Sequence, residues 1–364
     1  MTLAQTETCD DAGARLASPV LARTERQLPA NVTAVAALND GVQARAAFAL
    51  GDGSVRIRDI GKAEDGPSIG ESECVVFHDG AATALEPFLR GFVSAGQDGR
   101  IVHCLAADAS VAPLFDFGGR WVDALAVHEP SGHIAAAAER HLVVLDQRGK
   151  VQFETDAFPS TISGLSFAPE GRRIAAAHLD GLSVLSIDGG VQEHRLVWKG
   201  SHIGVSWSPD GRYIVSATQE RELHVWDLVT LRDLRLGGYP RKIHGMQWLA
   251  KGEFLVCTGA DVMTAWAFAE AGPGGRPPIE IGYVYDGLVT AVAANPARAL
   301  VAGGYSNGSL LVGGVTKGEA LLARGSEGDT VTALSWLPYG RCLIAGTAAG
   351  HAIVVGVPQD LGIR

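Results

Sequence analysis

Short apolar runs alternate with turn residues along most of this chain. Residues 204–228, GVSWSPDGRYIVSATQERELHVWDL, hold an apolar run, a Ser-Pro-Asp-Gly turn, a second apolar run, a polar turn and a third run. Apolar runs of this length between Gly- and Pro-containing turns predict antiparallel strands rather than helices. We therefore expect an all-β chain made of consecutive hairpins.

The first strand of this pattern recurs. A four-residue apolar signature begins at residues 32, 82, 122, 162, 203, 243, 289 and 331, so the spacings are 50, 40, 40, 41, 40, 46 and 42 residues. Three clear strands and a weaker fourth follow in each unit. A repeat of about 40–45 residues with four strands is typical of a β-propeller blade, which buries its faces only by stacking against its neighbours.

Eight signatures predict eight blades, with seven as the alternative. The third strand of the last unit ends near residue 357, which leaves too little chain for a fourth strand. Residues 18–29, SPVLARTERQLP, are strand-like and precede the first unit. We expect them to supply the missing outer strand and close the ring, which leaves fewer open edges. Residues 1–17 then form a flexible tail, and residues 18–364 form a single domain.

The unit at residues 204–228 resembles a WD40 repeat through its SPDG turn, its second-strand serine and its single Trp-Asp pair. The resemblance extends from about residue 19 to near the end of the chain, with degenerate motifs. The family's buried hydrogen-bonded set joins a His before the first strand, a Ser in the second, an Asp in the following turn and a Trp in the third. The resemblance and the tight Asp turns imply structural roles for His78, Ser94, Asp98, Asp52, Asp180, Ser216 and Trp226.

Two units depart from the family's set. In the second unit Cys104 stands at the Trp position. In the fifth unit Lys199 stands at the His position and Glu220 at the Asp position. The resemblance therefore supports the architecture more strongly than it supports the full set of buried hydrogen bonds.

Composition narrows the class of partner. The net charge is −10, the pI is about 5.5, and no basic stripe is visible, which disfavours nucleic acid. Five scattered cysteines argue for a reducing compartment and against a disulfide framework. No signal peptide or membrane-length apolar run is present. We expect a cytoplasmic, bacterial, monomeric protein that does not bind membranes.

The sequence contains no pattern of a known catalytic, phosphate-binding or calcium-binding loop. His128, His133 and His141 lie close in sequence, but on a hairpin loop and successive strands, which predicts side chains that point apart. We expect no metal, no cofactor and no catalytic residue. Residues 61–73, rich in Gly and acidic residues, are expected to form an exposed loop.

One face remains as the candidate site. In propellers of this type, the loops that enter the first strand share a face with the loops between strands two and three. Aromatic residues and arginine on this face are typical interface anchors. The predicted partner-binding residues are Arg120, Trp121, Asp123, Phe158, Trp198, His202, Tyr239, Arg241, Lys242, His244 and Tyr285.

The resulting hypothesis is a non-enzymatic scaffold that presents this rigid face to a protein or peptide. The alternative is a propeller enzyme or small-ligand binder at the mouth of the central channel. A deep pocket with two or more convergent carboxylates or histidines would favour that alternative, whereas a broad face with exposed Trp and Tyr would favour the scaffold.

Overall fold

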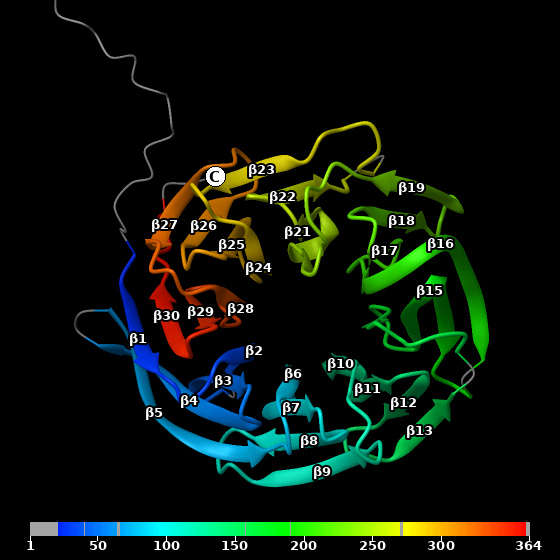
Figure 1. Ribbon diagram of the computed structural model, residues 1–364, viewed down its shortest axis with the longest axis horizontal. Helices are drawn as coiled ribbons and strands as arrows, with labels where there is room; N and C mark the ends of the chain where they lie inside the picture. Colours follow the sequence, from blue (N-terminus) through cyan, green and yellow to red (C-terminus); the bar gives the residue numbers. More distant parts are fainter. Residues whose placement is uncertain are drawn as a thin grey trace, which may run out of the picture.

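The computed structural model describes residues 21–361, except residues 40, 64–65, 157, 190 and 270–271. Within these residues the chain forms seven antiparallel sheets around one axis (Figure 1). Two 3-10 turns, η1 (Glu129–Ser131) and η2 (Ala250–Gly252), are the helical segments of this part. The expected all-β propeller is confirmed. No helix in the described residues is long and apolar enough to span a membrane.

Five sheets are simple four-stranded meanders in which each strand pairs with the next. Their strands, sheet by sheet, are β2 (Val32–Asn39), β3 (Ala44–Leu50), β4 (Ser54–Ala63) and β5 (Gly66–Phe77); β6 (Ala82–Phe88), β7 (Gly91–Gly96), β8 (Arg100–Leu105) and β9 (Val111–Asp116); β10 (Ala124–His128), β11 (His133–Ala138), β12 (His141–Leu145) and β13 (Val151–Thr155); β20 (Met246–Trp248), β21 (Phe254–Cys257), β22 (Val262–Ala267) and β23 (Ile279–Tyr283); β24 (Val289–Ala294), β25 (Leu300–Tyr305), β26 (Leu310–Gly314) and β27 (Ala320–Arg324).

The sixth sheet closes the ring. It contains β28 (Val331–Trp336), β29 (Cys342–Thr347) and β30 (His351–Gly356), and its outer strand is β1 (Arg23–Gln27) from the other end of the chain. Strand β1 pairs antiparallel with β30, from Arg23 opposite Val355 to Gln27 opposite His351. The predicted closure by the leading segment is confirmed for these residues. Residues 1–17, the predicted tail, lie outside the described residues.

The seventh sheet has six strands: β14 (Gly164–Phe167), β15 (Arg173–Ser186), β16 (Gln192–Trp207), β17 (Tyr213–Thr218), β18 (Leu223–Asp227) and β19 (Arg232–Leu236). Strand β16 pairs with β15 through its first part and with β17 through its last part. It therefore joins the outer edge of the fourth repeat unit to the inner edge of the fifth. The expectation of eight separate sheets is corrected to seven, the alternative number, because these two units share one sheet.

The hydrophobic core lies between neighbouring units rather than within one sheet. One buried cluster, for example, joins Phe48 of β3 to Ile344 of β29, across the closing junction. Another joins Ile174 of β15 to Ile162 and to Val144 of β12. A further cluster packs Ala177 and Val184 of β15 against Trp207 and Ile214, so the fourth and fifth units also stack face to face. Each unit thus buries the faces that it cannot cover alone.

Residues 61–73 do not form the expected exposed loop. Strands β4 and β5 extend through most of this segment, with Ile60 opposite Ile69 and Ala63 opposite Gly66. Ile60 and Ile69 are both buried against the closing sheet. Burial of these two side chains outweighs the turn-rich composition, so the segment continues the hairpin.

Candidate functional site

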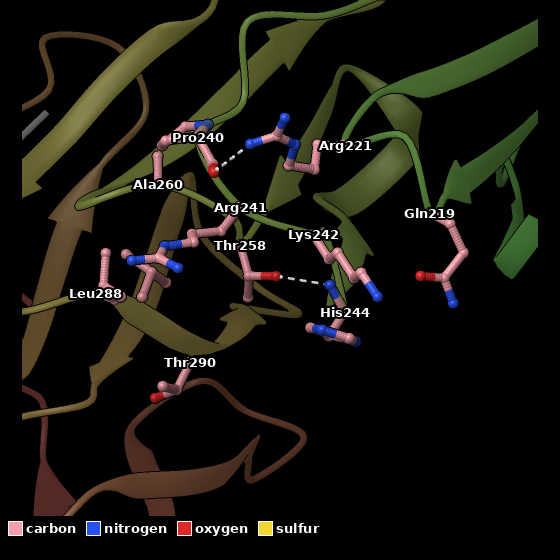
Figure 2. A pocket seen from close by; sticks show the side chains of 12 residues that line it. Gln219, Arg221, Pro240, Arg241, Lys242, His244, Thr258, Ala260, Leu288 and Thr290 are labelled. Atoms are coloured by element: carbon pink, nitrogen blue, oxygen red, sulfur yellow. Dashed lines mark hydrogen bonds between the residues drawn. The ribbon is translucent and has the colours of Figure 1, made fainter.

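The antiparallel order places two kinds of connection on one face of the ring. The start of each inner strand and the turn after each second strand lie at the same edge of a sheet. The loop before β20, the turn after β21, the turn after β17 and the loop before β24 meet at this edge around a pocket (Figure 2). This is the face on which the sequence predicts partner binding.

The pocket has a volume of about 600 Å³. We call it the cationic pocket, because four of its lining residues carry basic side chains. It is lined by Gln219, Arg221, Pro240, Arg241, Lys242, His244, Thr258, Gly259, Ala260, Leu288, Val289 and Thr290. Three predicted partner-binding residues, Arg241, Lys242 and His244, therefore lie together. Arg221 and Gln219 were not predicted, although they occupy a turn between strands two and three.

Hydrogen bonds fix the backbone of the loop that carries these side chains. The hydroxyl of Thr258 accepts from the backbone N–H groups of His244 and Gly245, at 3.1 and 3.0 Å. The N–H of Arg241 donates to the carbonyl oxygen of Gly259 at 3.0 Å. Arg221 donates to the carbonyl oxygen of Pro240 at 3.2 Å. The loop is thus a fixed platform for its side chains.

The basic side chains of this loop point in different directions. Figure 2 shows the guanidinium of Arg241 on the side of Leu288, whereas the amino group of Lys242 and the ring of His244 lie on the side of Gln219. Arg241, Lys242 and His244 are all exposed. None of these three side chains has a hydrogen-bond or ion-pair partner within the described part of the chain.

Two predicted aromatic anchors are exposed. Tyr285 is 84% exposed and lies in the loop that leads to Leu288 at the pocket. Its carbonyl oxygen accepts from the side-chain amide of Asn307 at 3.2 Å, which holds the loop. Trp121 is 61% exposed, in the loop before β10. Strands β10 and β24 stand on opposite sides of the axis in Figure 1, so these aromatics mark separate parts of the face.

Two other predicted aromatics are buried rather than exposed. Phe158 packs inside the cluster between β12 and β14. Tyr239 is buried in the cluster between β17 and β21, and burial raises its pKa well above the usual value. The Tyr239 hydroxyl accepts from Trp266 Nε1 at 2.7 Å and bonds Thr264 Oγ1 at 2.9 Å. These two loop aromatics therefore pack between neighbouring units instead of facing solvent.

His202 and Trp198 are also engaged inside the fold. His202 is 1% exposed; its Nδ1 bonds Ser216 Oγ at 2.7 Å and its Nε2 bonds the carbonyl oxygen of Trp198 at 3.0 Å. Burial lowers the pKa of His202. His202, and not Lys199, therefore fills the His position of the fifth unit. The half-buried ring of Trp198 stacks on His224, with ring centroids 4.0 Å apart.

Arg120 and Asp123 are exposed but bonded to their own surroundings. Arg120 Nε donates to the carbonyl oxygen of Phe117 at 3.0 Å, and its terminal nitrogen lies 3.1 Å from His141 Nδ1. The carboxylate of Asp123 accepts from the N–H of Glu139 at 2.6 Å. Both residues shape the loop beside Trp121.

The second unit contains the buried hydrogen-bonded set that the resemblance implies. His78 Nδ1 lies 2.9 Å from Asp98 Oδ1, and its Nε2 lies 3.0 Å from Ser94 Oγ. Although burial opposes ionisation of Asp98, hydrogen bonds from His78 and Arg100 hold its pKa at about 2. Cys104 faces Phe92 across the strands, the register that Trp226 has with Ile214 in the fifth unit.

Asp52 lies in a turn as expected, whereas Asp180 lies at a register shift inside β15 rather than in the expected turn. Asp52 accepts from the N–H and hydroxyl of Ser54, at 3.0 and 2.7 Å. Asp180 accepts from the N–H of Gly200 at 3.1 Å. Ser216 and Trp226 are buried.

The histidines of the third unit do not all point apart as expected. His128 and His133 are cross-strand neighbours, and the Nδ1 atoms of both lie within 2.9 Å of Ser131 Oγ. His141 lies away from them, near Arg120 and Glu154. The hairpin that carries η1 brings the first two together. The described residues hold no group of three or more His, Cys, Asp or Glu side chains placed to bind a metal.

Comparisons with known proteins agree with this geometry. Residues 192–227, from β16 to the end of β18, match the family model described as WD domain, G-beta repeat. The fold is similar to the computationally designed Ika8 protein, with a TM-score of 0.71 and 19% identity over 91% of this chain and 98% of that chain. It is similar to the C-terminal WD40 domain of Sif2, with a TM-score of 0.70 and 13% identity over 92% and 99%.

Identities this low show the fold alone. The search of curated protein sequences found no match. The WD40 resemblance is nevertheless confirmed where the sequence carries its strongest motifs, and the chain is a β-propeller that contains a WD40 repeat at residues 192–227.

Proposed function

We propose that this protein is a non-enzymatic interaction scaffold whose cationic pocket and neighbouring loops bind a protein or peptide partner. The observation that carries the proposal is the cluster of exposed basic side chains without partners on a fixed loop, with exposed Tyr285 in the next loop of the same face. Arginine and aromatic residues are enriched among the residues that dominate binding energies.

The alternative, an enzyme or small-ligand binder, has less support. An enzyme or small-ligand site is expected to show a pocket with two or more convergent carboxylates or histidines. The residues that line the cationic pocket include one histidine, His244, and no carboxylate. This set can hold an anionic group, but it offers no acid and base pair for proton transfer. The scattered cysteines support the proposed cytoplasmic location, which stays a prediction.

The proposal is tested by affinity capture of the tagged protein from its own organism, with quantitative mass spectrometry. Arg241→Glu is expected to lower recovery of the specific partner about tenfold, a loss of about 1.4 kcal/mol. Trp121→Ala is expected to lower it as well if the partner spans the face. Thermal unfolding should match that of the wild type, because both side chains are exposed.

Matched controls lie on the opposite face. Arg148 and Lys317 are exposed residues in turns between third and fourth strands, which the antiparallel order places at the other edge of each sheet. Arg148→Glu and Lys317→Glu should leave recovery unchanged. If Arg241→Glu and Trp121→Ala, the rim variants, recover as much partner as the wild type, the partner uses another surface. Loss of recovery only with the control variants would show the same.

A further inference from the structure

The cationic pocket is basic although the chain as a whole is acidic. Three nearby carboxylates, those of Glu220, Glu222 and Asp261, are directed elsewhere. The carboxylate of Glu220 lies beside Gly200, on the side of the preceding loop. Glu222 pairs with Arg235 at 3.1 Å. Asp261 and Glu280 line an adjoining cavity of about 280 Å³, which shares Pro240 and Ala260 with the cationic pocket. The lining of the cationic pocket is therefore left with positive charge that no lining side chain neutralises.

Arg221 adds a second and independent observation. It has a φ of 64°, in the left-handed region that glycine tolerates and other residues rarely adopt. Its N–H bonds the carbonyl of the residue three before it, as do the N–H groups of glycines at the same turn position. These are Gly53, Gly99, Gly308 and Gly350, with φ between 82° and 91°.

An arginine in this conformation is strained compared with one of negative φ. The fifth unit thus has a strained arginine where four other units have glycine, and that arginine lines the pocket. Seven other described non-glycine residues also have a positive φ, so the case for Arg221 rests on its place in the pocket lining together with its φ.

The placement of the charges favours a ligand with several negative groups. A single phosphate is held by donors that converge on one point. Here the guanidinium of Arg241 and the amino group of Lys242 lie on different sides of the pocket (Figure 2). A peptide with two or more carboxylates can meet both cations, and the pocket volume accommodates a few side chains.

We propose that the cationic pocket recognises an acidic peptide segment, with Arg221, Arg241 and Lys242 as the residues that select for Asp and Glu. This inference rests on the proposed scaffold function and specifies its partner. The exposed ring of Tyr285, three residues before Leu288 on the loop that reaches the pocket, offers the segment an apolar contact on the same face.

Selection from a random decapeptide library on the immobilised full-length protein tests this specificity. Peptides retained by the wild type should be enriched in Asp and Glu relative to the input. Lys242→Glu should abolish the enrichment, and Lys317→Glu should preserve it. A retained peptide should bind about tenfold more weakly to Arg241→Glu, and more weakly at higher salt.

Absence of acidic enrichment, or enrichment that Lys242→Glu leaves unchanged, would overturn the inference. Displacement of a retained peptide by millimolar inorganic phosphate as readily as by the unlabelled peptide would overturn it too, because the site would then bind a single anion. If cellular capture still depends on Arg241 while the library shows no acidic preference, the inference fails and the scaffold function stands. If no rim variant changes capture of the cellular partner, the proposed scaffold function itself is contradicted.

Arg221→Gly separates binding from stability. Glycine relieves the left-handed strain, so we expect the midpoint of thermal unfolding to stay level or rise. The same change should weaken binding of a retained acidic peptide about tenfold, because one cation is lost. A variant with lower stability and unchanged affinity would assign Arg221 a structural role and contradict its role in recognition.

Discussion

At the scale of single residues, His224 is the most unusual buried group near the face. It is fully buried, and neither ring nitrogen has a hydrogen-bond partner among the described residues. Its ring stacks on Trp198 and meets the edge of Trp226, with centroids 4.0 and 4.4 Å away. Burial lowers the pKa of His224 to about 4. The fold therefore holds this imidazole neutral between two aromatic rings.

This burial predicts a specific loss of stability in acid. The pKa of His224 is lower in the folded protein than the unfolded value of about 6.5. The contribution of the neutral ring to folding stability is therefore complete above about pH 6.5 and is lost as the pH falls toward 4. His224→Phe removes the titrating group. The free energy of unfolding of the variant, relative to that of the wild type, should therefore be up to about 3 kcal/mol higher at pH 4 than at pH 7. Urea unfolding at several pH values measures this, and parallel curves for the two proteins would contradict it.

Residue roles could be predicted where they depend on local chemistry. Asp52 and Asp98 accept hydrogen bonds from residues two positions on, and such turns are visible in sequence. His202 could not be assigned to the buried hydrogen-bonded set from sequence. It precedes Ser216, its partner, by 14 residues, whereas His78 precedes Ser94 by 16. Phe158 and Tyr239 look like exposed loop aromatics until neighbouring units cover them, which sequence does not show.

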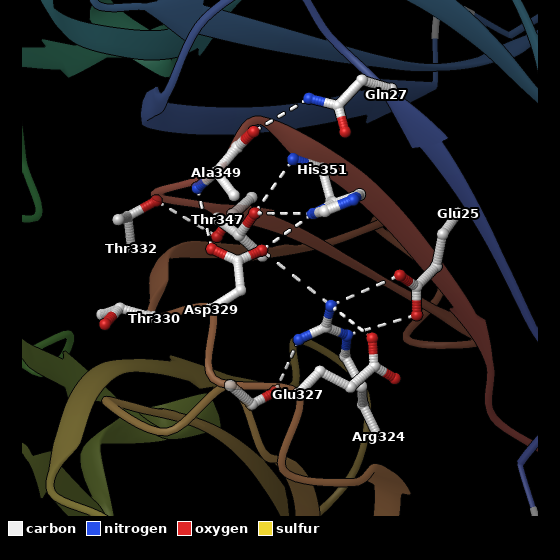
Figure 3. Close-up of polar contacts among 12 residues, drawn as sticks. Glu25, Gln27, Arg324, Glu327, Asp329, Thr330, Thr332, Thr347, Ala349 and His351 are labelled. Atoms are coloured by element: carbon white, nitrogen blue, oxygen red, sulfur yellow. Dashed lines mark hydrogen bonds and ion pairs between the residues drawn. The ribbon is translucent and has the colours of Figure 1, made fainter.

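At the scale of elements, the junction that closes the ring contains a buried cation. Arg324, at the end of β27, is 1% exposed at its side chain. It pairs with Glu25 of β1 at 3.2 Å and with Glu327 at 2.9 Å, and donates to the carbonyl oxygen of Gly308 at 2.9 Å (Figure 3). Gln27 donates to the carbonyl oxygen of Ala349 at 2.8 Å nearby. Side-chain bonds thus join β1 both to β27 of the neighbouring sheet and to the turn before β30.

Removal of this cation should loosen the closure. Arg324→Met removes the buried cation, whereas the partly exposed carboxylates of Glu25 and Glu327 keep their ion pairs with Arg23. We therefore expect the free energy of unfolding to fall by about 1.5–3 kcal/mol, as for the loss of charged hydrogen bonds. Amide exchange in β1 should accelerate. Arg235→Met is the matched control, because the Arg235 side chain that pairs with Glu222 is 60% exposed, so its loss should cost less than about 1 kcal/mol. Equal losses for the two variants would show that the buried cluster has no special part in closure.

The existence of the strands could be predicted, whereas their grouping into sheets could not. Periodic apolar runs locate the inner strands, and the signatures at Val32, Ala82, Val289 and Val331 begin β2, β6, β24 and β28. The continuity of β16 depends on hydrogen bonds to both β15 and β17, which come from tertiary packing. A strand of 16 residues has no local signal that distinguishes it from two strands and a turn.

At the scale of the whole molecule, a ring of stacked units converts scattered loops into one rigid face. The chain carries a net charge of −10, yet Arg221, Arg241, Lys242 and His244 gather at one pocket on this face. The sequence predicted the face and three of these residues, because connectivity alone decides which loops share an edge. It could not predict the pocket itself, since that requires loops of successive units to meet in space.

The central claim is that the partner occupies the cationic pocket. Hydrogen exchange of the captured complex against the free protein tests this most directly. We expect slower exchange at amides of residues 219–221, 241–244, 258–260 and 286–290, with no change at residues 146–150 and 314–319 on the opposite face. Protection confined to the opposite face or to the outer strands would contradict the claim.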